Sequence, residues 1–600
     1  MRWDELPRLL RTLRHLRPSQ VYWRGRYLAE RRFSRVMGEK SAATAGTHGP
    51  IPRVHWDLPR TLFAEWNWPG DEKLVHQLSQ GTFEHLNQVR ELGRPVNWLL
   101  GPADRDRLWT VTLHYHRWVY ELSLRAVRDD ELGRQASGLL IELVSDWIAR
   151  CDVSTPGSRP LAWNAYATAT RIGWWVRSVL WLGEEWWLRH ADFQTRFLAS
   201  LWQQAGYLAD HIEWDLRGNH LIRDALGLAW AGRFFDAPEA KKWLALATAL
   251  AADQCREQVL ADGGHFERSP MYHLHVMEDF CLLLELLEDA AVKKRLRSAL
   301  AGMAEFARWT RHPDGRIPPL NDAAHEDDFL SADLLERVAK SGLTVDSSSP
   351  AGERYCGGRY CGGRHFADTG LAIWRGNPWT VFFDVGPIGP DYQPGHGHAD
   401  NLTLECSFCG TPVFVDPGTH SYDRDERRAY DRSTAAHNTV CVDRTDSSEV
   451  WHIFRVGRRA KAIRVDVKAN SKALDAAAAH DGYVHLGVIH HRRVQVAEGG
   501  ALAIVDRLEG RGSHHFEGGW LLAPDWTAAV CDFGWELRRK NHVLRVTLRG
   551  PGGLRLSVTS RPWHPMFGVE SHTQRLVWEW DGELPFEVQT IVAPPESGSP

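Results

Sequence analysis

The chain has 600 residues, of which 43% are hydrophobic and 25% charged, a balance typical of a globular protein long enough for more than one domain. Its 72 Lys and Arg residues and 76 Asp and Glu residues give a formal net charge of -4, which excludes a global electrostatic basis for binding nucleic acid. No stretch approaches the apolar length of a membrane span, so we expect no transmembrane segment.

Residues 1–60 form a basic N-terminal segment. Arginine is frequent as far as residue 36, and Leu9, Leu10, Leu13 and Leu16 recur at helical spacing. Such a helix can lie on a membrane surface or bind a partner, but we favour a helix that packs on its own protein with its arginines in solvent. The segment lacks the apolar core and the cleavage site of a secretory signal, which predicts a cytoplasmic location.

Residues 61–345 are predicted to be helical. Their apolar residues recur at helical intervals in segments of roughly 12 to 20 residues, as in AYATATRIGWWVRSVLWLGEEWW. Short polar breaks separate the segments, which favours a stack of antiparallel helix pairs. The chain has 29 Trp residues, whose indole rings can stack on sugars. We expect most of them to fill helix interfaces, as Trp175 and Trp187 would.

Polar motifs interrupt the helical part. In Gly218-Asn219-His220, the amide and the imidazole at a helix start can face a cleft, or Asn219 can cap the helix that follows. In DGGHFERSPMYH, residues 262–273, Tyr272 falls near the first turn of the next helix. Its phenol can be a general acid or a core residue with a satisfied hydroxyl. Asn321-Asp322 is a third and weaker polar turn.

Residues 346–364 are rich in Ser and Gly, which predicts a linker. Over residues 365–600 the hydrophobic period changes to two, as in Leu402, Leu404 and Cys406 and in the runs RVQVAE and ALAIVDRL. Many short strands with Gly turns predict a large antiparallel β-sandwich. The nine cysteines are an odd number spread widely, which favours reduced thiols.

The segment from Gly395 to Val440 concentrates side chains that can carry chemistry. These are His396, His398, Asp400, Asp416, Tyr422, Tyr430 and His437. Imidazole and carboxylate groups can hold a divalent metal ion, and imidazole and phenol groups can exchange protons with a bound substrate. We therefore expect this segment to form half of a functional site.

Taken together, these motifs resemble the heparinase II/III-like polysaccharide lyases. The resemblance rests on GNH at 218–220, DGGHFERSPMYH at 262–273, LNDA at 320–323, and GHGHADNLTLE, VDPGTHSYD and RSTAAHNTV between 395 and 440. It implies an α+β multidomain protein with an N-terminal incomplete α/α toroid and a C-terminal antiparallel β-sandwich. That division agrees with the change in hydrophobic period.

The resemblance also implies roles for individual residues. Asn219 and His220 would approach the substrate carboxylate, Tyr272 would transfer the catalytic proton, and His396 would lie across the cleft. A second tyrosine is used by some members, and here it matches Tyr430 or Tyr422, of which we favour Tyr430. The metal-holding residues of the family match His398, Asp416 and His437. Two imidazoles and one carboxylate suit Zn²⁺ in a structural role.

One departure concerns the residues after GNH. Many relatives would have Glu-Asn where this chain has Arg223-Asp224, which can alter the charge near the substrate. The chemistry of the sugar-binding subsites is therefore left open.

The resemblance implies a lyase that cleaves a uronic-acid-containing polysaccharide by β-elimination. A glycoside hydrolase is an alternative that needs two opposed carboxylates, for which Glu267 and Asp322 are the candidates. A non-catalytic saccharide-binding protein that works beside exopolysaccharide assembly is another. The expected partner is an acidic polysaccharide or oligosaccharide, and the oligomeric state is left open, with a homodimer among the options. The cell envelope is the family-based alternative to a cytoplasmic location.

Overall fold

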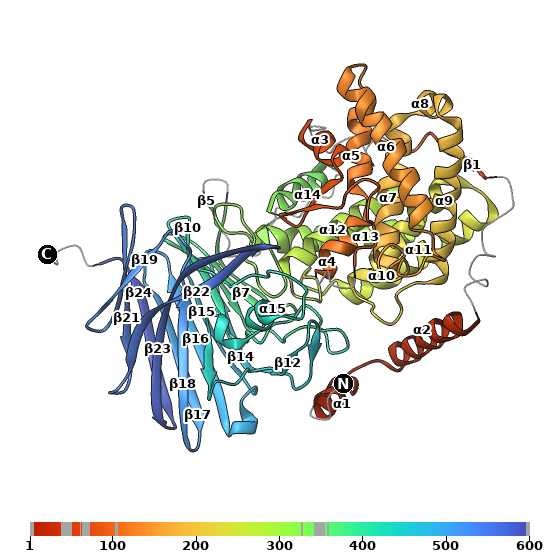
Figure 1. Cartoon of the computed structure of the whole chain (residues 1–600). Helices are drawn as coiled ribbons and strands as arrows, with labels where there is room; N and C mark the ends of the chain where they lie inside the picture. The colour runs from red at the N-terminus through yellow and green to blue at the C-terminus, as the bar shows by residue number, and fades with distance from the viewer. Residues whose placement is uncertain are drawn as a thin grey trace. The chain divides into compact units, whose positions relative to one another are not determined.

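The computed structural model describes residues 5–37, 51–59, 62, 72–101, 106–325, 328–340, 354–356 and 359–595. Contacts divide the chain into two compact units. The helical unit comprises Arg17–Glu257 and Glu278–Ser298, and the sheet unit comprises Met1–Leu16, Gln258–Met277 and Ala299–Pro600. Figure 1 shows the helices of the first and the strands of the second.

The helical unit is built mainly from helices, as the hydrophobic period predicts. They are α2 (Pro18–Met37), α3 (Glu72–Ser79), α4 (Arg107–Leu113), α5 (Arg117–Ala126), α6 (Glu131–Arg150), α7 (Ala165–Leu182), α8 (Glu184–Arg189), α9 (Ala191–Asp210), α10 (Asn219–Phe234) and α11 (Pro238–Gln258). The short strands β1 (Arg53–Val54) and β4 (Phe235–Asp236) pair with each other, as do β2 (Thr82–His85) and β3 (Gln88–Glu91). Residues of α12 (Pro270–Leu286) and α13 (Ala290–Trp309) fall in both units. The predicted boundary at residue 345 lies between these helices and the large sheets in sequence, whereas the sheet unit already includes residues 258–277 and 299–345.

Local capping and close packing explain the central helices of the helical unit. Asn164 begins α7 by accepting a hydrogen bond from the Ala167 backbone N–H at 3.2 Å. Gly227 of α10 lies against Ala169 of α7, where an added Cβ would come within 2.7 Å of the Ala169 Cα. The buried Trp175 ring stacks on Phe197 with centroids 4.3 Å apart. Trp175 and Trp187 are fully buried, so both fill helix interfaces as expected.

Among its described residues, the sheet unit contains three large sheets whose strands pair antiparallel. A six-stranded sheet has the order β10-β9-β8-β7-β6-β5, from β5 (Arg354–Cys356), β6 (Arg359–Phe366), β7 (Leu371–Arg375), β8 (Trp379–Asp384), β9 (Leu404–Phe408) and β10 (Thr411–Phe414). A four-stranded sheet has the order β11-β18-β23-β22, from β11 (Val440–Val442), β18 (Ser513–Leu521), β22 (Arg555–Met566) and β23 (Val569–Glu583).

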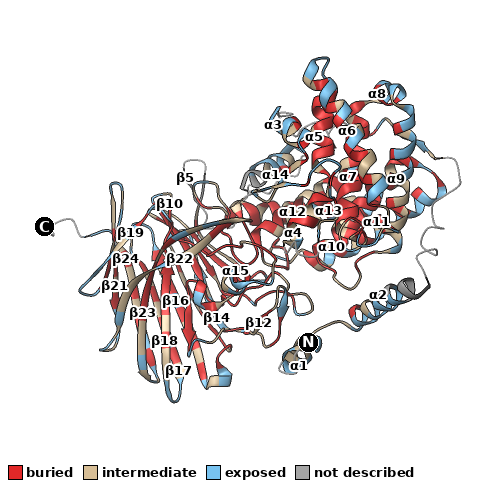
Figure 2. Ribbon diagram, viewed as in Figure 1, coloured by how far each residue is buried: buried red, intermediate tan, exposed pale blue. Residues whose placement is uncertain are grey.

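The third sheet has eight strands in the order β14-β15-β16-β17-β24-β21-β20-β19. They are β14 (Ala462–Ala469), β15 (Ala473–His480), β16 (Val488–Ala497), β17 (Leu502–Gly510), β19 (Thr527–Cys531), β20 (Gly534–Arg539), β21 (His542–Arg549) and β24 (Phe586–Ala593). Along β16 and β17 buried residues alternate with more exposed ones, which confirms the predicted period of two (Figure 2). A helical N-terminal part and antiparallel sheets in the C-terminal part are thus confirmed.

Strand β9 departs from this alternation because all five of its residues are buried. One face joins the main core through Leu404, Cys406 and Phe408. The other face carries Glu405 and Ser407, which form hydrogen bonds with the buried His312 at 3.0 Å and 2.7 Å. The polar positions of this alternation therefore form an internal network.

The predicted linker lies partly within the described residues. Its residues 346–353 and 357–358 lie outside the described part of the chain, but β5 and the first residues of β6 lie within it. Gly363 of β6 packs so closely against the next segment that an added Cβ would be 3.0 Å from the Ala469 Cβ. Gly363 therefore permits a close approach of two segments at this point of β6.

The N-terminal segment contains a short helix, α1 (Leu6–Leu13), which belongs to the sheet unit. It contacts its own protein as expected, but the orientation differs from the prediction. Arg11 binds Glu449 with both ends of its guanidinium, at 2.7 Å and 2.6 Å, whereas Leu10 is 60% exposed. Across the described residues, every helix is too short or too polar to span a membrane.

Candidate active site

The first element of the site is the start of α12. Pro270 occupies the first helical position, and the Ser269 hydroxyl accepts a hydrogen bond from the Tyr272 backbone N–H at 3.2 Å. The same hydroxyl donates to the Asp322 carbonyl at 2.6 Å. This turn places Tyr272 in the first turn of α12, as the sequence predicts.

Tyr272 meets two residues of the 395–440 segment within the sheet unit. Its phenol oxygen lies 2.9 Å from the phenol oxygen of Tyr422. Its ring stacks on the imidazole of His396, with centroids 3.8 Å apart and planes inclined by 26°. Two phenols and an imidazole are therefore in direct contact, which is an arrangement suited to proton transfer.

Buried carboxylates hold His396 from both sides. Its Nδ1 lies 2.9 Å from Asp322 Oδ2, and its Nε2 lies 3.4 Å from Glu267 Oε2. The second oxygen of Asp322 lies 2.9 Å from Nε2 of His398, and Arg428 binds both oxygens of the same carboxylate. Asp322 thus connects His396, His398 and Arg428 in one buried network.

The charges in this network decide which groups hold protons. Burial alone would raise the pKa of Asp322, but the Arg428 guanidinium and the two histidines hold it well below its usual range. Asp322 is therefore a carboxylate and can only accept, so Nδ1 of His396 and Nε2 of His398 carry hydrogens that they donate to it. Burial and the Asp322 charge hold the pKa of the Tyr422 phenol well above its usual value. Tyr422 therefore keeps its proton at neutral pH.

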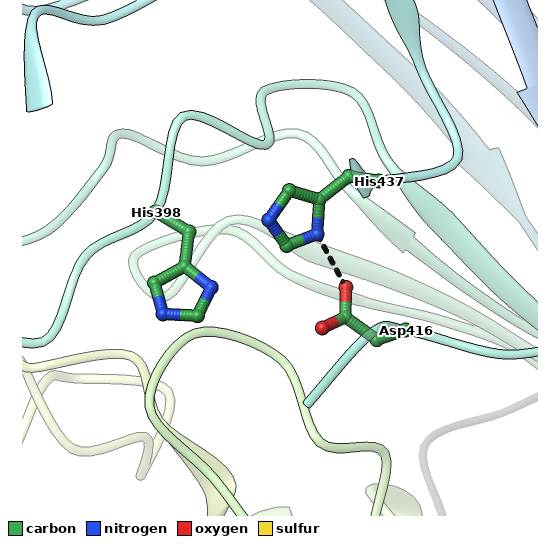
Figure 3. A group of neighbouring side chains, drawn as sticks. All are labelled: His398, Asp416 and His437. Atoms are coloured by element: carbon green, nitrogen blue, oxygen red, sulfur yellow. Dashed lines mark hydrogen bonds and ion pairs between the residues drawn. The ribbon is translucent and has the colours of Figure 1, made fainter. Parts of the chain in front are cut away.

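The predicted metal ligands converge. One nitrogen or oxygen from each of His398, Asp416 and His437 lies within 4.8 Å of the others, and all three residues are buried. Figure 3 shows a ring nitrogen of His398 turned toward Asp416 and His437. Burial lowers the pKa of His398 to about 4, so its imidazole is neutral. Its Nδ1 is buried and has no hydrogen-bond partner among the described residues.

This arrangement fits a divalent metal ion. Because Nε2 of His398 donates to Asp322, the unpartnered Nδ1 has a lone pair available, and such a carboxylate–histidine pair typically orients metal-bound imidazoles. Nε2 of His437 lies 3.0 Å from the Asp431 carbonyl, and its Nδ1 lies 2.7 Å from Asp416 Oδ2. Burial alone would lower the pKa of His437, but the Asp416 carboxylate raises it to about 9, so a metal ion bound at Nδ1 would displace the proton held there. Two imidazoles and one carboxylate are a ligand set typical of Zn²⁺.

Tyr430, the second phenol favoured from the sequence, lies elsewhere. It is in the short helix α15 (Glu426–Asp431), and its hydroxyl donates to the Pro562 carbonyl at 3.1 Å. Tyr422 is the phenol in contact with Tyr272. Tyr422 rather than Tyr430 contacts Tyr272 because Asp431 fixes the path of the loop that carries both tyrosines. The Asp431 carboxylate accepts hydrogen bonds from the His420 backbone at 2.9 Å and from His564 at 2.6 Å.

Asn219 and His220 belong to the helical unit. Gly218 is the N-cap of α10 and Asn219 is its first residue, so Asn219 does not cap the helix. Nδ1 of His220 lies 2.8 Å from Glu213 Oε2. Arg223, which departs from the family pattern, pairs with Asp279 at 3.0 Å, so its charge is compensated within this unit.

Two neighbours of the phenols were not anticipated from the sequence. Arg428 lies with its guanidinium carbon 4.9 Å from the centroid of the Tyr422 ring, and the Phe454 ring lies 4.9 Å from the same ring. Neither residue belongs to a recognisable motif. The one available signal is that Arg428 lies in the polar stretch between Tyr422 and His437.

Comparisons with known proteins find the same family in both parts of the chain. The family model described as Heparinase II/III N-terminus matches residues 70–341, and the model described as Heparinase II/III-like, C-terminal matches residues 361–591. A heparin-sulfate lyase of Bacteroides thetaiotaomicron is 24% identical over 394 residues, which cover 58% of this chain and 53% of that protein. A heparin-sulfate lyase of Pedobacter heparinus is 23% identical over 411 residues, which cover 62% and 57%. The chain spans about half the length of the curated relatives it matches.

Solved structures share the fold. A crystal structure of heparinase III matches with a TM-score of 0.72 and 18% identity, covering 89% of this chain and 88% of that chain. The heparan sulfate lyase HepC from Pedobacter heparinus matches with a TM-score of 0.59 and 18% identity, covering 89% and 85%. At such identities the likeness establishes the fold alone.

Proposed function

Because the chain belongs to the heparinase II/III-like family, we propose that it is a polysaccharide lyase that cleaves a uronic-acid-containing polysaccharide by β-elimination. The observation that carries the proposal is the contact of the Tyr272 phenol with both Tyr422 and His396. The curated relatives are heparin-sulfate lyases, which supports an acidic polysaccharide as the substrate class. We also propose that the helices form an incomplete α/α toroid and the sheets a β-sandwich.

The reaction removes the proton at C5 of the uronate and breaks the bond between C4 and the leaving oxygen. A C4–C5 double bond forms, the leaving oxygen gains a proton, and no water is consumed. The C5 proton is very weakly acidic while the neighbouring carboxylate is ionised, so hydrogen-bond donors must stabilise the developing charge. Asn219 and His220 are the proposed donors, because an amide and an imidazole can donate hydrogen bonds to the substrate carboxylate.

Tyr272 is proposed to exchange the substrate proton. Tyr422 keeps its own proton because its pKa is well above the usual value, so its hydroxyl can donate to the Tyr272 oxygen and stabilise the phenolate. His396 stacks on Tyr272 and is fixed by Asp322 at Nδ1. Asp322 and Arg428 touch His396 and Tyr422 and are proposed to position them.

A divalent metal ion, proposed to be Zn²⁺, would be held by His398, Asp416 and His437. When bound, it would supply a structural cross-link between the segments that carry these residues. His398 and His396 both bind the Asp322 carboxylate. A metal ion that fixes His398 would therefore also help to fix the imidazole of His396 beside Tyr272.

The geometry weighs against the hydrolase alternative. A hydrolase needs one carboxyl group that gives up a proton and a second that activates water or attacks the sugar. Asp322 is held as a carboxylate by Arg428 and two histidines, so it cannot act as the acid. Glu267 is buried, and its Oε2 lies 3.4 Å from Nε2 of His396, so its carboxyl group is engaged with that imidazole.

The direct test is incubation of the protein with heparan-type polymers, alginate and bacterial exopolysaccharides. The proposal predicts ultraviolet absorbance from the C4–C5 double bond with at least one of these substrates. New reducing ends without that absorbance would indicate hydrolysis. Binding without any product would favour a saccharide-binding protein.

A further inference from the structure

We propose that the hairpin of residues 449–458 forms a sugar-contacting wall beside Tyr272, and that the N-terminal helix α1 holds it in place. The hairpin consists of β12 (Val450–Trp451) and β13 (Arg455–Val456), joined by a turn with Phe454 at its tip. The proposal rests on the proposed lyase function, because the wall is assigned to the same acidic saccharide.

Phe454 is the residue of this hairpin that would touch the ligand. Its ring lies 4.9 Å from the Tyr422 ring and 6.1 Å from the His396 ring, yet the residue is 42% exposed. Its Cβ also lies 3.8 Å from the position of an added Cβ on Gly395. An exposed aromatic face beside two proposed reacting groups is suited to pack against the apolar face of a sugar ring.

The turn is attached directly to the network of the site. The Ile453 carbonyl accepts hydrogen bonds from Nε and Nη2 of Arg428, at 3.1 Å and 3.0 Å, and from Nη1 of Arg432 at 3.1 Å. The same Arg428 guanidinium binds the Asp322 carboxylate. The position of Phe454 is therefore coupled to the carboxylate that fixes His396.

Helix α1 holds the other end of the hairpin. Arg11 binds the Glu449 carboxylate with two hydrogen bonds, and the Trp451 indole donates to the Thr12 hydroxyl at 3.1 Å. Gly457 leaves the space that the Glu449 carboxylate occupies, because an added Cβ there would come within 2.2 Å of Oε2. A bidentate pair between Arg and a carboxylate fixes geometry as well as charge.

This role goes beyond the family match, which starts at residue 70, whereas α1 covers Leu6–Leu13. It also explains the unexpected orientation of α1. The helix presents Arg11 and Thr12 to the hairpin, and its leucines are not needed for that contact.

The first experiment tests Phe454 as a contact residue. Phe454→Ala is expected to raise KM, and the Kd for an acidic oligosaccharide measured in the Tyr272→Phe background, by about tenfold. The value of kcat should fall less than KM rises. Phe533→Ala is the matched control, because Phe533 is a 72% exposed phenylalanine of the sheet unit in the turn between β19 and β20.

The second experiment tests whether α1 holds the hairpin of residues 449–458 in place. Arg11→Glu is expected to raise KM in the same direction as Phe454→Ala and to increase hydrogen exchange in residues 449–458. Arg14→Glu, an exposed position one residue beyond α1, is expected to change neither. An exchange increase restricted to the hairpin separates a local clamp from general destabilisation.

The outcomes separate this inference from the lyase assignment. An active wild-type enzyme whose KM is unchanged by Phe454→Ala overturns the sugar-contacting role alone. Hydrogen exchange in residues 449–458 that is unchanged by Arg11→Glu overturns the proposal that α1 holds the hairpin. A wild-type protein that neither cleaves nor binds any acidic saccharide overturns both the inference and the proposed function.

Discussion

The phenol oxygens of Tyr272 and Tyr422 lie 2.9 Å apart, although 150 positions separate the two residues in the chain. Tyr272 comes from the first turn of α12, and Tyr422 comes from a loop that follows β10. Both belong to the sheet unit, so one compact unit contains the proposed proton-transfer pair. The Asp322 network then fixes the neighbouring imidazole and guanidinium around that pair.

Replacement of Tyr422 with Phe should lower kcat. The substitution removes the hydroxyl that is proposed to stabilise the Tyr272 phenolate, which is a loss of about 10²- to 10³-fold if it acts like one donor of an oxyanion hole. It should also move the rising limb of kcat against pH to higher pH, because Tyr272 would then ionise less readily. A pH–rate profile of the two enzymes checks both effects.

Tyr430→Phe is the matched control for that substitution. It removes only a hydrogen bond to the Pro562 carbonyl, so it should cost about 0.5 to 1.5 kcal/mol of stability and leave kcat and the pH profile nearly unchanged. A large loss of kcat in Tyr430→Phe, with the kcat of Tyr422→Phe unchanged, would show that Tyr430 and not Tyr422 is the second phenol.

Asp322→Asn should strongly destabilise the sheet unit. The substitution leaves the buried Arg428 guanidinium without its carboxylate, and breaking a buried pair in this way typically costs about 3 to 5 kcal/mol. Asp314→Asn is the control, because the Asp314–Arg316 pair is partly exposed and should contribute about 1 kcal/mol or less. Urea unfolding of the three proteins measures the difference, and equal effects would contradict the organising role of Asp322.

Acid should weaken a second buried network that lies in the eight-stranded sheet. Asp506 binds His490 at 2.7 Å and Arg492 at 2.7 Å and 2.9 Å. Burial alone would raise the pKa of Asp506, but Arg492 and His490 lower it to about 2. An unfolded Asp has a pKa of about 3.9, so this group contributes about 2 to 3 kcal/mol above that pH.

That contribution should be lost as the pH falls from about 4 toward 2, because the folded-state pKa lies below the unfolded value. The Asp506→Asn variant has no carboxyl group to protonate at this position, so its stability does not fall with pH for this reason. The stability difference between wild type and Asp506→Asn, measured by urea unfolding at successive pH values, should therefore shrink over that interval. A difference that does not change with pH would show that Asp506 is not held as a carboxylate in the folded protein.

Removal of metal should lower stability. If His398, Asp416 and His437 hold a Zn²⁺ ion, dialysis against a chelator should lower the thermal midpoint by several degrees, and added Zn²⁺ should restore it. His437→Ala should abolish metal binding as measured by elemental analysis, whereas His572→Ala, at an exposed position, should not. Equal metal content in the two variants would contradict the assignment.

The sequence predicts those site residues whose position depends on local structure. Ser269 and Pro270 mark a helix start, so Tyr272 could be placed in the first turn of α12. The choice between Tyr422 and Tyr430 could not be made, because the path of their loop is fixed by His564, which is 133 positions from Asp431. The orientation of α1 was missed for the same reason, since Glu449 lies 438 positions from Arg11.

The linker prediction rested on composition alone. Serine and glycine are common both in flexible connections and in strands that a neighbouring backbone approaches closely, and composition does not separate the two cases. The packing of Gly363 against Ala469 appears only when distant segments are placed together.

Proton transfer at Tyr272 is the step on which the proposed lyase activity depends most directly. The decisive measurement is the product mass formed from an acidic oligosaccharide by wild type and by Tyr272→Phe, together with the Kd of the variant. We predict that wild type forms fragments without added water and with a C4–C5 double bond. Tyr272→Phe should bind the oligosaccharide with similar Kd and turn it over about 10²- to 10⁴-fold more slowly. Unsaturated product formed by Tyr272→Phe at the wild-type rate would contradict the account.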